Sequence, residues 1–309
     1  MAQTVPQKPK AALAPTVQPE QVEPPPVEKK VTAILITRNQ AAELRRAVAA
    51  LELSTIREHM DILAVDCGST DDIRRVGDEH PGLTMLYLPD DFGSTKALNI
   101  AVRTAKTDLL FFVSPDVEVA PDSLELLMER LASASDTAAA CPLLVNTQGQ
   151  PAPLFEAIPT RASLAQACAG GAPPSLTLDL SQESVAVGYP GRYALLLRKQ
   201  FIIGMNYFDE RCGEYWAAAD LAMRIHRAQR KIRVYPAIRA VFHDAKPVPD
   251  DVVHASDKTF GAARLLGKYD GFLSGFSFSL SAIFRALGRF DFSLLGALLG
   301  GKKIGSHAN

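Results

Sequence analysis

The segment DLLFFVSPDVEV (108–119) is an apolar run that stops at a polar turn. The stretch 108–113 is a short, strongly apolar run, which predicts a strand buried on both faces. Ser114, Pro115 and Asp116 follow at once, and a proline beside small polar residues is typical of a strand end. A carboxylate therefore stands where a buried strand leaves the predicted core.

Three similar strands precede this one, and amphipathic helices separate them. The other predicted strands of this half are VTAILI (31–36), DILAV (61–65) and TMLYL (84–88). The apolar stripes of the predicted helices are Leu44, Val48 and Leu51, then Leu98, Ala101, Val102 and Ala105, then Leu124, Leu127, Met128 and Leu131. Alternating strands and helices predict an α/β fold, with a mostly parallel sheet covered by helices on both faces.

The second half of the chain continues this pattern after a less regular stretch. Residues 146–190 are rich in Gly, Pro, Ser, Ala and Gln, which is typical of a functional lid or an insert. Strands are expected at 192–199 and 231–236, with a helix between them. The predicted organisation is a disordered Pro-rich tail (1–30), a catalytic domain (31–245) and a C-terminal helical segment (246–309).

Composition excludes several classes of protein. The chain of 309 residues has a net charge of −1, which gives no electrostatic case for nucleic acid. Its 4 cysteines form no C-x-x-C pair, and the first residues lack the apolar run of a secretory signal. No G-x-G-x-x-G follows the first strand, and no G-x-x-x-x-G-K-[ST] occurs. We therefore expect a cytoplasmic protein without a dinucleotide or P-loop site.

Polar residues follow three of the predicted strands. They are residues 37–39, 66–71 and 114–116. In a parallel sheet the ligand binds at the carboxyl ends of the strands, so these three clusters are expected at one edge.

At these residues the chain resembles the GT-A glycosyltransferases of family 2, in particular their rhamnosyltransferase-like branch. The likeness covers about residues 31–244 and rests on seven segments in the family's order. They are VTAILITRN, ILAVDCGSTDD, DFGSTKALNIAV, LLFFVSPDVEV, YFDERCGEYW, ADLAMRIHRAQRKIRVYP and AVFHD. The resemblance implies an inverting transfer of a sugar from a nucleoside-diphosphate donor, a UDP- or dTDP-sugar, to a glycan or lipid-linked acceptor in polysaccharide assembly.

The resemblance also implies Mg²⁺ or Mn²⁺ at the diphosphate, because hard divalent cations neutralise this leaving group. Asp116 matches the second acid of the family's D-x-D motif, and Ser114 occupies the first position. His243 matches the histidine that completes the metal site in the family. The plain alternatives are a turn-capping acid for Asp116 and a structural histidine for His243.

Further positions match donor-binding residues of the family. Asp66 matches the acid that accepts a hydrogen bond from the pyrimidine N3–H, and an Asx turn is its alternative role. Thr37 and Asn39 match residues that line the nucleoside pocket, although Asn39 equally suits a helix cap. Lys96 and Asn99 match the segment beside the donor, where Lys96 would offset phosphate charge or simply be solvated.

One departure from the family concerns the general base. The family's Glu-Asp pair before Asp-Leu is replaced here by Ala217 and Ala218, and alanine cannot accept a proton. Asp220 remains as a candidate base, with an ion pair to Arg224 as its alternative role. Glu214, or the neighbouring Asp209 or Glu210, are the other candidates. A catalytically degenerate nucleotide-sugar-binding protein with a regulatory or scaffolding role is the alternative function.

The C-terminal segment contains two uncharged apolar runs, 271–284 and 292–301. Each is shorter than the roughly 20 residues that span a bilayer. Their phenylalanines, leucines and nearby basic residues predict a helix that lies on the inner face of the membrane. An apolar helix docked on the domain is the alternative.

Overall fold

The computed structural model describes residues 27–171, 175–190, 194–243 and 251–305. Most of the predicted tail (1–30) and the predicted boundary at 245/246 lie outside these residues.

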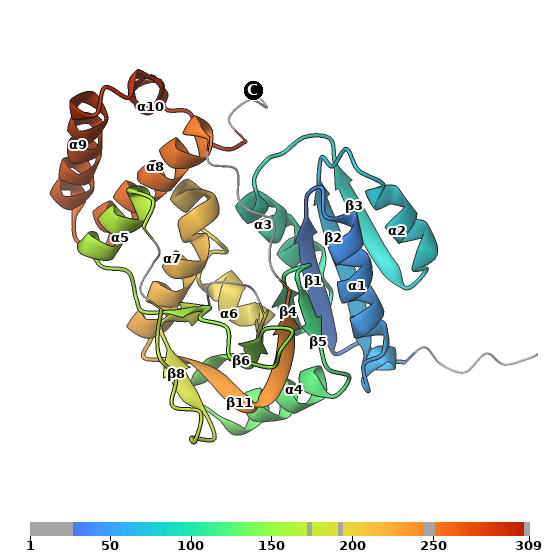
Figure 1. The fold of residues 1–309 in the computed structure, drawn as a ribbon. Helices are drawn as coiled ribbons and strands as arrows, with labels where there is room; N and C mark the ends of the chain where they lie inside the picture. The colour runs from blue at the N-terminus through green and yellow to red at the C-terminus, as the bar shows by residue number, and fades with distance from the viewer. Residues whose placement is uncertain (1–26, 172–174, 191–193, 244–250, 306–309) are drawn as a thin grey trace, which may run out of the picture.

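The elements alternate along the chain much as the hydrophobic pattern predicts (Figure 1). The strands are β1 (Val31–Thr37), β2 (Met60–Cys67), β3 (Leu83–Leu88), β4 (Leu109–Val113), β5 (Val117–Val119), β6 (Thr137–Val145), β7 (Phe155–Glu156), β8 (Val185–Val187), β9 (Tyr189–Pro190), β10 (Ala194–Arg198) and β11 (Lys231–Phe242). The helices are α1 (Ala41–Glu52), α2 (Ile73–Glu79), α3 (Ser94–Thr104), α4 (Ser123–Ser133), α5 (Arg161–Cys168), α6 (Lys199–Gly204), α7 (Gly213–Arg227), α8 (Val252–Tyr269), α9 (Phe272–Gly288) and α10 (Phe292–Leu299), with short 3₁₀ turns η1 (Arg57–His59) and η2 (Glu210–Cys212).

The main sheet has the strand order β3-β2-β1-β4-β10-β6-β11-β5, with β8 paired to β11. The β3-β2-β1-β4 half is parallel throughout. Beyond it the sheet is mixed, because β10 runs antiparallel between β4 and β6. The expected α/β fold is confirmed, and its parallel half carries the edge on which the polar clusters were predicted to meet.

Helices cover both faces of this sheet, as the buried character of its strands requires. Helix α1 packs against β1 and β5, whereas α3 packs against β1 and β2. Helix α4 covers β6, β10 and β11. Figure 1 shows α1 and α3 on opposite sides of the parallel strands.

Strand β6 was not among the predicted strands, although all nine of its residues are buried. Its sequence, TAAACPLLV, contains four small residues and a proline and therefore lacks a strong β-propensity signal. Its place between β10 and β11 makes it a central strand of the second half.

The C-terminal helices form a unit attached to α7. Helix α8 packs on α7, α9 packs on α8, and α10 contacts both α8 and α9. Two glycines permit these close approaches: a Cβ at Gly261 would overlap the carbonyl oxygen of Cys212 and lie 2.8 Å from Trp216, and one at Gly275 would lie 2.5 Å from the Ala263 carbonyl oxygen. Across the described ranges, every helix is too short or too polar to cross a bilayer.

We expect Gly261→Ala to destabilise the protein, although alanine normally favours a helix by about 1 kcal/mol over glycine. The added methyl group would push α8 away from α7, at an expected cost of about 1–3 kcal/mol. Gly296→Ala in α10 is the matched control, because a Cβ there meets nothing within 4 Å. Urea denaturation of both variants checks this prediction, and equal stability gains in both would contradict it.

Candidate functional site

The carboxyl ends of the parallel strands bring three predicted residues to one edge of the sheet. Thr37 ends β1 and is paired in register with Asp66 of β2. Asp116 follows β4, which runs parallel to β1 on its other side. All three residues are buried, with 1%, 4% and 2% of their surfaces exposed. Buried polar side chains gathered at the carboxyl ends of parallel strands are typical of a binding site.

The Asp66 carboxylate organises the loop after β2. It accepts hydrogen bonds from the backbone N–H of Ser69 (3.2 Å to Oδ1) and from the Ser69 hydroxyl. The bonded N–H lies three residues along the chain, so the carboxylate closes a turn one residue longer than the predicted Asx turn. The turn holds the carboxylate in a fixed direction at the edge, so it is compatible with recognition of a ligand.

Asn39 joins two loops of the edge and does not cap α1. Its backbone adopts a positive φ of 52°, and its side-chain oxygen accepts the N–H of Thr70 at 2.8 Å. Helix α1 begins after Gln40, and Asp71 accepts the Ala41 N–H at 2.9 Å. The helix-cap interpretation of Asn39 is thus wrong, because Asp71 from the neighbouring loop performs that role.

A cavity of about 380 Å³ opens beside Asp66. The loop after β2 lines one side, and the end of β3 with residues 89–90 lines the other. Two further lining residues are Arg74 and Tyr87, with the guanidinium 4.8 Å from the ring centroid. This volume and its mixture of an aromatic ring with a fixed carboxylate suit a small planar ligand. We did not predict Tyr87 or Arg74 from the sequence. The Tyr87 ring lies beside Asp66 because β3 pairs with β2, and this pairing is known only from the structure.

Asp116 and His243 are neighbours through the backbone. The His243 N–H donates to the Asp116 carbonyl oxygen at 2.9 Å, because β5 and β11 pair directly beside them. The His243 ring contacts Glu118 through Nε2 at 2.9 Å. A carboxylate bonded to one ring nitrogen of histidine is a common way to orient the other nitrogen toward a metal.

This group fits a divalent cation. Mg²⁺ and Mn²⁺ in nucleotide sites are held by one or two carboxylates together with substrate phosphate oxygens. Asp116 supplies such a carboxylate just beyond the carboxyl end of β4, with His243 beside it. Glu118, which we did not predict, would fix the orientation of His243.

Of the two predicted donor-binding residues of α3, Asn99 and Lys96, only Asn99 has surroundings different from those expected. Asn99 is 2% exposed, and its amide nitrogen donates to Phe208 O (3.1 Å) and Glu210 Oε1 (2.8 Å). Its side chain therefore fastens α3 to the loop before α7, and the donor-binding prediction for Asn99 is wrong. Lys96 is exposed, and its ammonium lies 4.5 Å from the Phe92 ring centroid.

Asp220 lies in a buried ion-pair network. It is fully buried, and its carboxylate contacts Lys268 Nζ at 2.6 Å, Arg224 at 2.9 Å and the Tyr269 hydroxyl at 2.9 Å. A carboxylate without solvent access and held by two cations is not available to an acceptor hydroxyl. The structure corrects the prediction that Asp220 is a general base and supports its alternative role as an ion-pair partner.

Asp209 belongs to the same network. Oxygen and sulfur atoms of Asp209, Cys212 and Asp220 lie within 4.8 Å of one another, which resembles a metal site. Burial favours a raised pKa for Asp209, but hydrogen bonds from Arg211 and Lys268 outweigh it and hold the pKa well below its usual range. These cations already neutralise the acids, so we interpret the cluster as structural.

Glu214 has a different environment at the first turn of α7. Its Oε2 accepts the Ser94 N–H at 2.8 Å, at the start of α3, and its own N–H donates to Asp257 at 2.9 Å. Burial raises the pKa of Glu214, and the negative charges of Asp91 and Asp257 raise it further. The Glu214 carboxylate thus lies next to the segment that follows β3. A raised pKa is a property expected of a general base.

Ala217 and Ala218, which replace the family's acidic pair, differ in burial. Ala217 is 1% exposed and belongs to the core, whereas Ala218 is half-buried. Helix α7 therefore presents small residues where the family's acids stand, and Glu214 lies one turn earlier.

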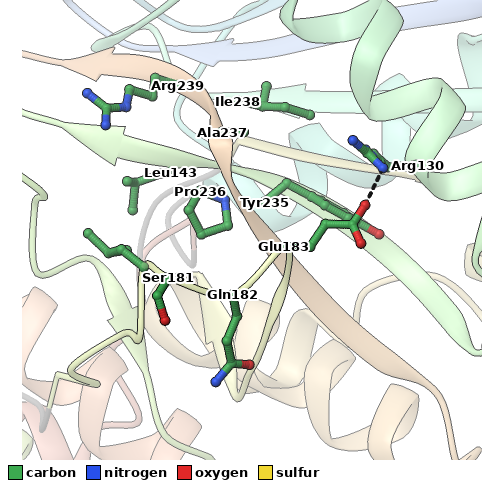
Figure 2. A pocket seen from close by; sticks show the side chains of 11 residues that line it. Arg130, Leu143, Ser181, Gln182, Glu183, Tyr235, Pro236, Ala237, Ile238 and Arg239 are labelled. Carbon is green, nitrogen blue, oxygen red and sulfur yellow. Dashed lines mark hydrogen bonds and ion pairs between the residues drawn. The ribbon is translucent and has the colours of Figure 1, made fainter.

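A second cavity, of about 480 Å³, lies where β11 shifts its register against β6 (Figure 2). Tyr235 and Pro236 lie along its β11 side, and an ion pair of 2.5 Å joins Arg130 to Glu183 across it. None of the predicted site residues lines this cavity.

Comparisons with known proteins concern the family and the fold of the chain. Residues 32–166 match the model "Glycosyl transferase family 2". The curated "Pre-mycofactocin glycosyltransferase" of two Mycobacterium tuberculosis strains, CDC 1551 and H37Rv, is 28% identical over 227 residues, or 71% of this chain and 43% of the relative. The chain thus spans less than half the length of these curated relatives.

Solved structures show the same fold at low sequence identity. S. aureus TarS 1–349 in complex with UDP has a TM-score of 0.53 and 15% identity, covering 78% of this chain and 66% of TarS. GalNAc-T7 with UDP, GalNAc and Mn²⁺ has a TM-score of 0.56 and 12% identity, covering 77% of this chain and 48% of that chain. The sheet and its helices are therefore of the GT-A type.

We expect Asp220→Ala to lower the free energy of unfolding by about 3–5 kcal/mol, because it leaves Lys268 and Arg224 without their buried counter-charge. Asp136→Ala is the control, since Asp136 also contacts two cations, Lys231 and Arg233, but its side chain is 42% exposed. Its loss is expected to be much smaller. Denaturant titration measures both values, and similar losses would contradict the buried-network interpretation.

Proposed function

Because residues 32–166 belong to glycosyl transferase family 2 and the fold is of the GT-A type, we propose that this protein transfers a sugar from a nucleoside-diphosphate donor to an acceptor hydroxyl, with inversion. The observation that carries the proposal is the meeting of Asp66 and Asp116 at one edge of the sheet. One carboxylate borders a cavity suited to a base, and the other is suited to a cation that binds the diphosphate.

The donor base would occupy the cavity beside Asp66. The Asp66 carboxylate would accept the N3–H of a pyrimidine, which uracil and thymine share, while its turn with Ser69 keeps it in place. The Tyr87 ring offers an apolar face against which a planar base can stack. These features favour a UDP- or dTDP-sugar, and the two structural neighbours described above were solved with UDP.

The diphosphate would lie toward Asp116. Asp116 and His243 would hold Mg²⁺ or Mn²⁺, which supplies Lewis-acid stabilisation of the leaving phosphate when bound. Glu118 keeps the His243 ring oriented through its contact at Nε2. Exposed Lys96, at the first turn of α3, adds positive charge near this edge.

Glu214 is the base that we propose. It would take the proton of the acceptor hydroxyl while the acceptor oxygen bonds to the anomeric carbon. The bond from that carbon to the donor phosphate breaks in the same step, and the nucleoside diphosphate leaves with the electron pair. A single displacement of this kind inverts the anomeric centre. Burial of Glu214 and its acidic neighbours raise its proton affinity.

The acceptor is proposed to be a glycan or a lipid-linked glycan in polysaccharide assembly. The M. tuberculosis relatives are named pre-mycofactocin glycosyltransferases, and this chain covers 43% of their length, so that name does not fix the acceptor of this chain. Acceptor choice therefore needs its own test.

A catalytically degenerate, nucleotide-sugar-binding protein is the second candidate. The replacement of the acidic pair by Ala217 and Ala218 and the buried ion pairs of Asp220 favour it. It would retain the donor site without efficient transfer and would regulate or scaffold an assembly complex. Turnover distinguishes the two candidates.

We expect Asp116→Asn to remove metal-dependent donor binding and to lower transfer or donor hydrolysis by at least about 100-fold, because the metal contributes several kcal/mol. A thermal-shift screen of UDP-, dTDP- and GDP-sugars with and without Mn²⁺ measures binding. A ligand at about 100 times its Kd stabilises the folded state by about 2.7 kcal/mol.

Asp122→Asn, before α4, is the control for the Asp116 variant and is expected to leave both binding and turnover unchanged. Metal-dependent binding by the wild-type protein without any turnover would favour the degenerate candidate. Full metal dependence in Asp116→Asn would contradict the assigned role of Asp116.

We expect Glu214→Gln to lower kcat by about 10²- to 10⁴-fold while the donor KM changes little. Only the ionised carboxylate accepts a proton, so the wild-type rate should fall as pH drops through the raised pKa. This acidic limb should lie above the ordinary glutamate value of 4.5 and should be absent in the variant. Glutamine keeps an oxygen for the Ser94 N–H, so the start of α3 stays capped.

Glu210→Gln is the matched control, because its side chain can still accept from Asn99. A pH–rate profile of Glu214→Gln that matched the wild type would show that Glu214 only caps α3.

A further inference from the structure

Large apolar side chains are concentrated on the outer surface of α9 and α10. Nine of them have at least 40% of their surface exposed, and they line these two helices and the turn between them. They are Phe272 (76%), Leu273 (76%), Phe276 (56%), Leu280 (40%), Phe284 (62%), Leu287 (48%), Phe290 (77%), Phe292 (65%) and Leu299 (69%). We call these nine residues the C-terminal apolar face. A continuous exposed patch of this kind usually marks an interaction surface.

The helical spacing separates this face from the side that packs on the protein. Phe272, Phe276, Leu280 and Phe284 follow one another every four residues and so share one side of α9. Gly275, Phe278 and Ala286 are buried on the other side. Figure 1 shows α9 and α10 at the outer margin of the molecule, away from the sheet. The apolar face therefore contributes little to the core.

Basic residues accompany the apolar face. The segment from α9 to residue 305 has Arg285, Arg289, Lys302 and Lys303, and Asp291 is its one acidic residue. Arg289 and Lys302 are exposed. Phenylalanines and leucines beside arginines and lysines are the composition of helices that lie in the headgroup region of anionic bilayers.

We propose that the C-terminal apolar face lies on an anionic phospholipid bilayer, with α9 and α10 in the plane of the interface. The apolar side chains would enter the boundary between headgroups and acyl chains, and the basic residues would contact lipid phosphates. Every helix in the described part of the chain is unable to span a bilayer, so this contact would be peripheral.

The C-terminal helices are also joined to the edge of the sheet that carries the proposed donor site. Asp257 of α8 accepts the N–H of Glu214 at 2.9 Å and also that of Ile304. A Cβ at Gly305 would lie 2.7 Å from the carbonyl oxygen of Phe92, just before α3. A bilayer bound by α9 and α10 would thus hold this edge at a set position, which, if the proposed transferase function holds, suits a lipid-linked acceptor.

Vesicle flotation with the full chain tests the proposal. The vesicles contain about 70 mol% phosphatidylcholine and about 30 mol% phosphatidylglycerol, and pure phosphatidylcholine vesicles serve for comparison. We expect the wild-type protein to bind the anionic vesicles and to bind more weakly in about 0.5 M salt, where charges are screened. The triple variant Phe272→Ser, Phe276→Ser, Phe284→Ser should bind at least 10-fold more weakly, since each change removes exposed apolar surface.

The matched control changes exposed apolar residues elsewhere: Leu53→Ser, Leu180→Ser and Ile203→Ser. These residues are 72%, 41% and 45% exposed, and binding should equal that of the wild type. Arg285→Glu with Arg289→Glu should weaken binding to anionic vesicles only. Circular dichroism checks that each variant is folded.

Several outcomes would overturn the proposal. One is a wild-type protein that does not float with anionic vesicles, and another is equal binding by the triple variant and its control. A third is a wild-type oligomer, measured by light scattering, that dissociates in the triple variant without any vesicle binding. That result would assign the face to contacts between copies of this chain. The vesicles hold no donor or acceptor, so these outcomes are independent of the transferase activity.

Discussion

The parallel pairing of β1 with β2 and β4 is the constraint on which the proposed site depends. Parallel strands place all their carboxyl ends at one edge, so residues far apart in the chain meet there without any direct bond between them. Thr37, Asp66 and Asp116 share this edge because each follows or ends one of these strands. The loops are then held by local bonds, as between Asn39 and Thr70.

Electrostatic surroundings separate acids that look alike in the sequence. Asp220 and Asp209 lie among Lys268, Arg224 and Arg211, which form ion pairs with them and occupy their oxygens. Glu214 lies near Asp91 and Asp257 instead, and burial adds to the cost of its charge. The first environment suits a structural ion pair, and the second suits a group that accepts a proton at moderate pH.

The C-terminal helices connect this edge of the sheet to the exposed apolar face. Close contacts at Gly261 and Gly275 allow α7, α8 and α9 to pack in succession. Asp257 then ties α8 to the backbone of Glu214. The positions of the apolar face and of the proposed base are therefore coupled, because both depend on the packing of α7, α8 and α9. Movement of either would strain the contacts between these helices.

The sequence by itself determined the α/β class, the order of most strands and helices, and the gathering of polar clusters at one edge, because hydrophobic periodicity and parallel topology are local or nearly local properties. It did not reveal β6, whose small residues carry a weak β signal, or the roles of Tyr87, Glu118 and Asp71, which depend on partners in other elements. It also left Asp220 and Glu214 as equal candidates for the base. Only the tertiary structure shows that their surroundings differ, because burial and neighbouring charges arise from residues such as Lys268 and Asp257 that are distant in the chain.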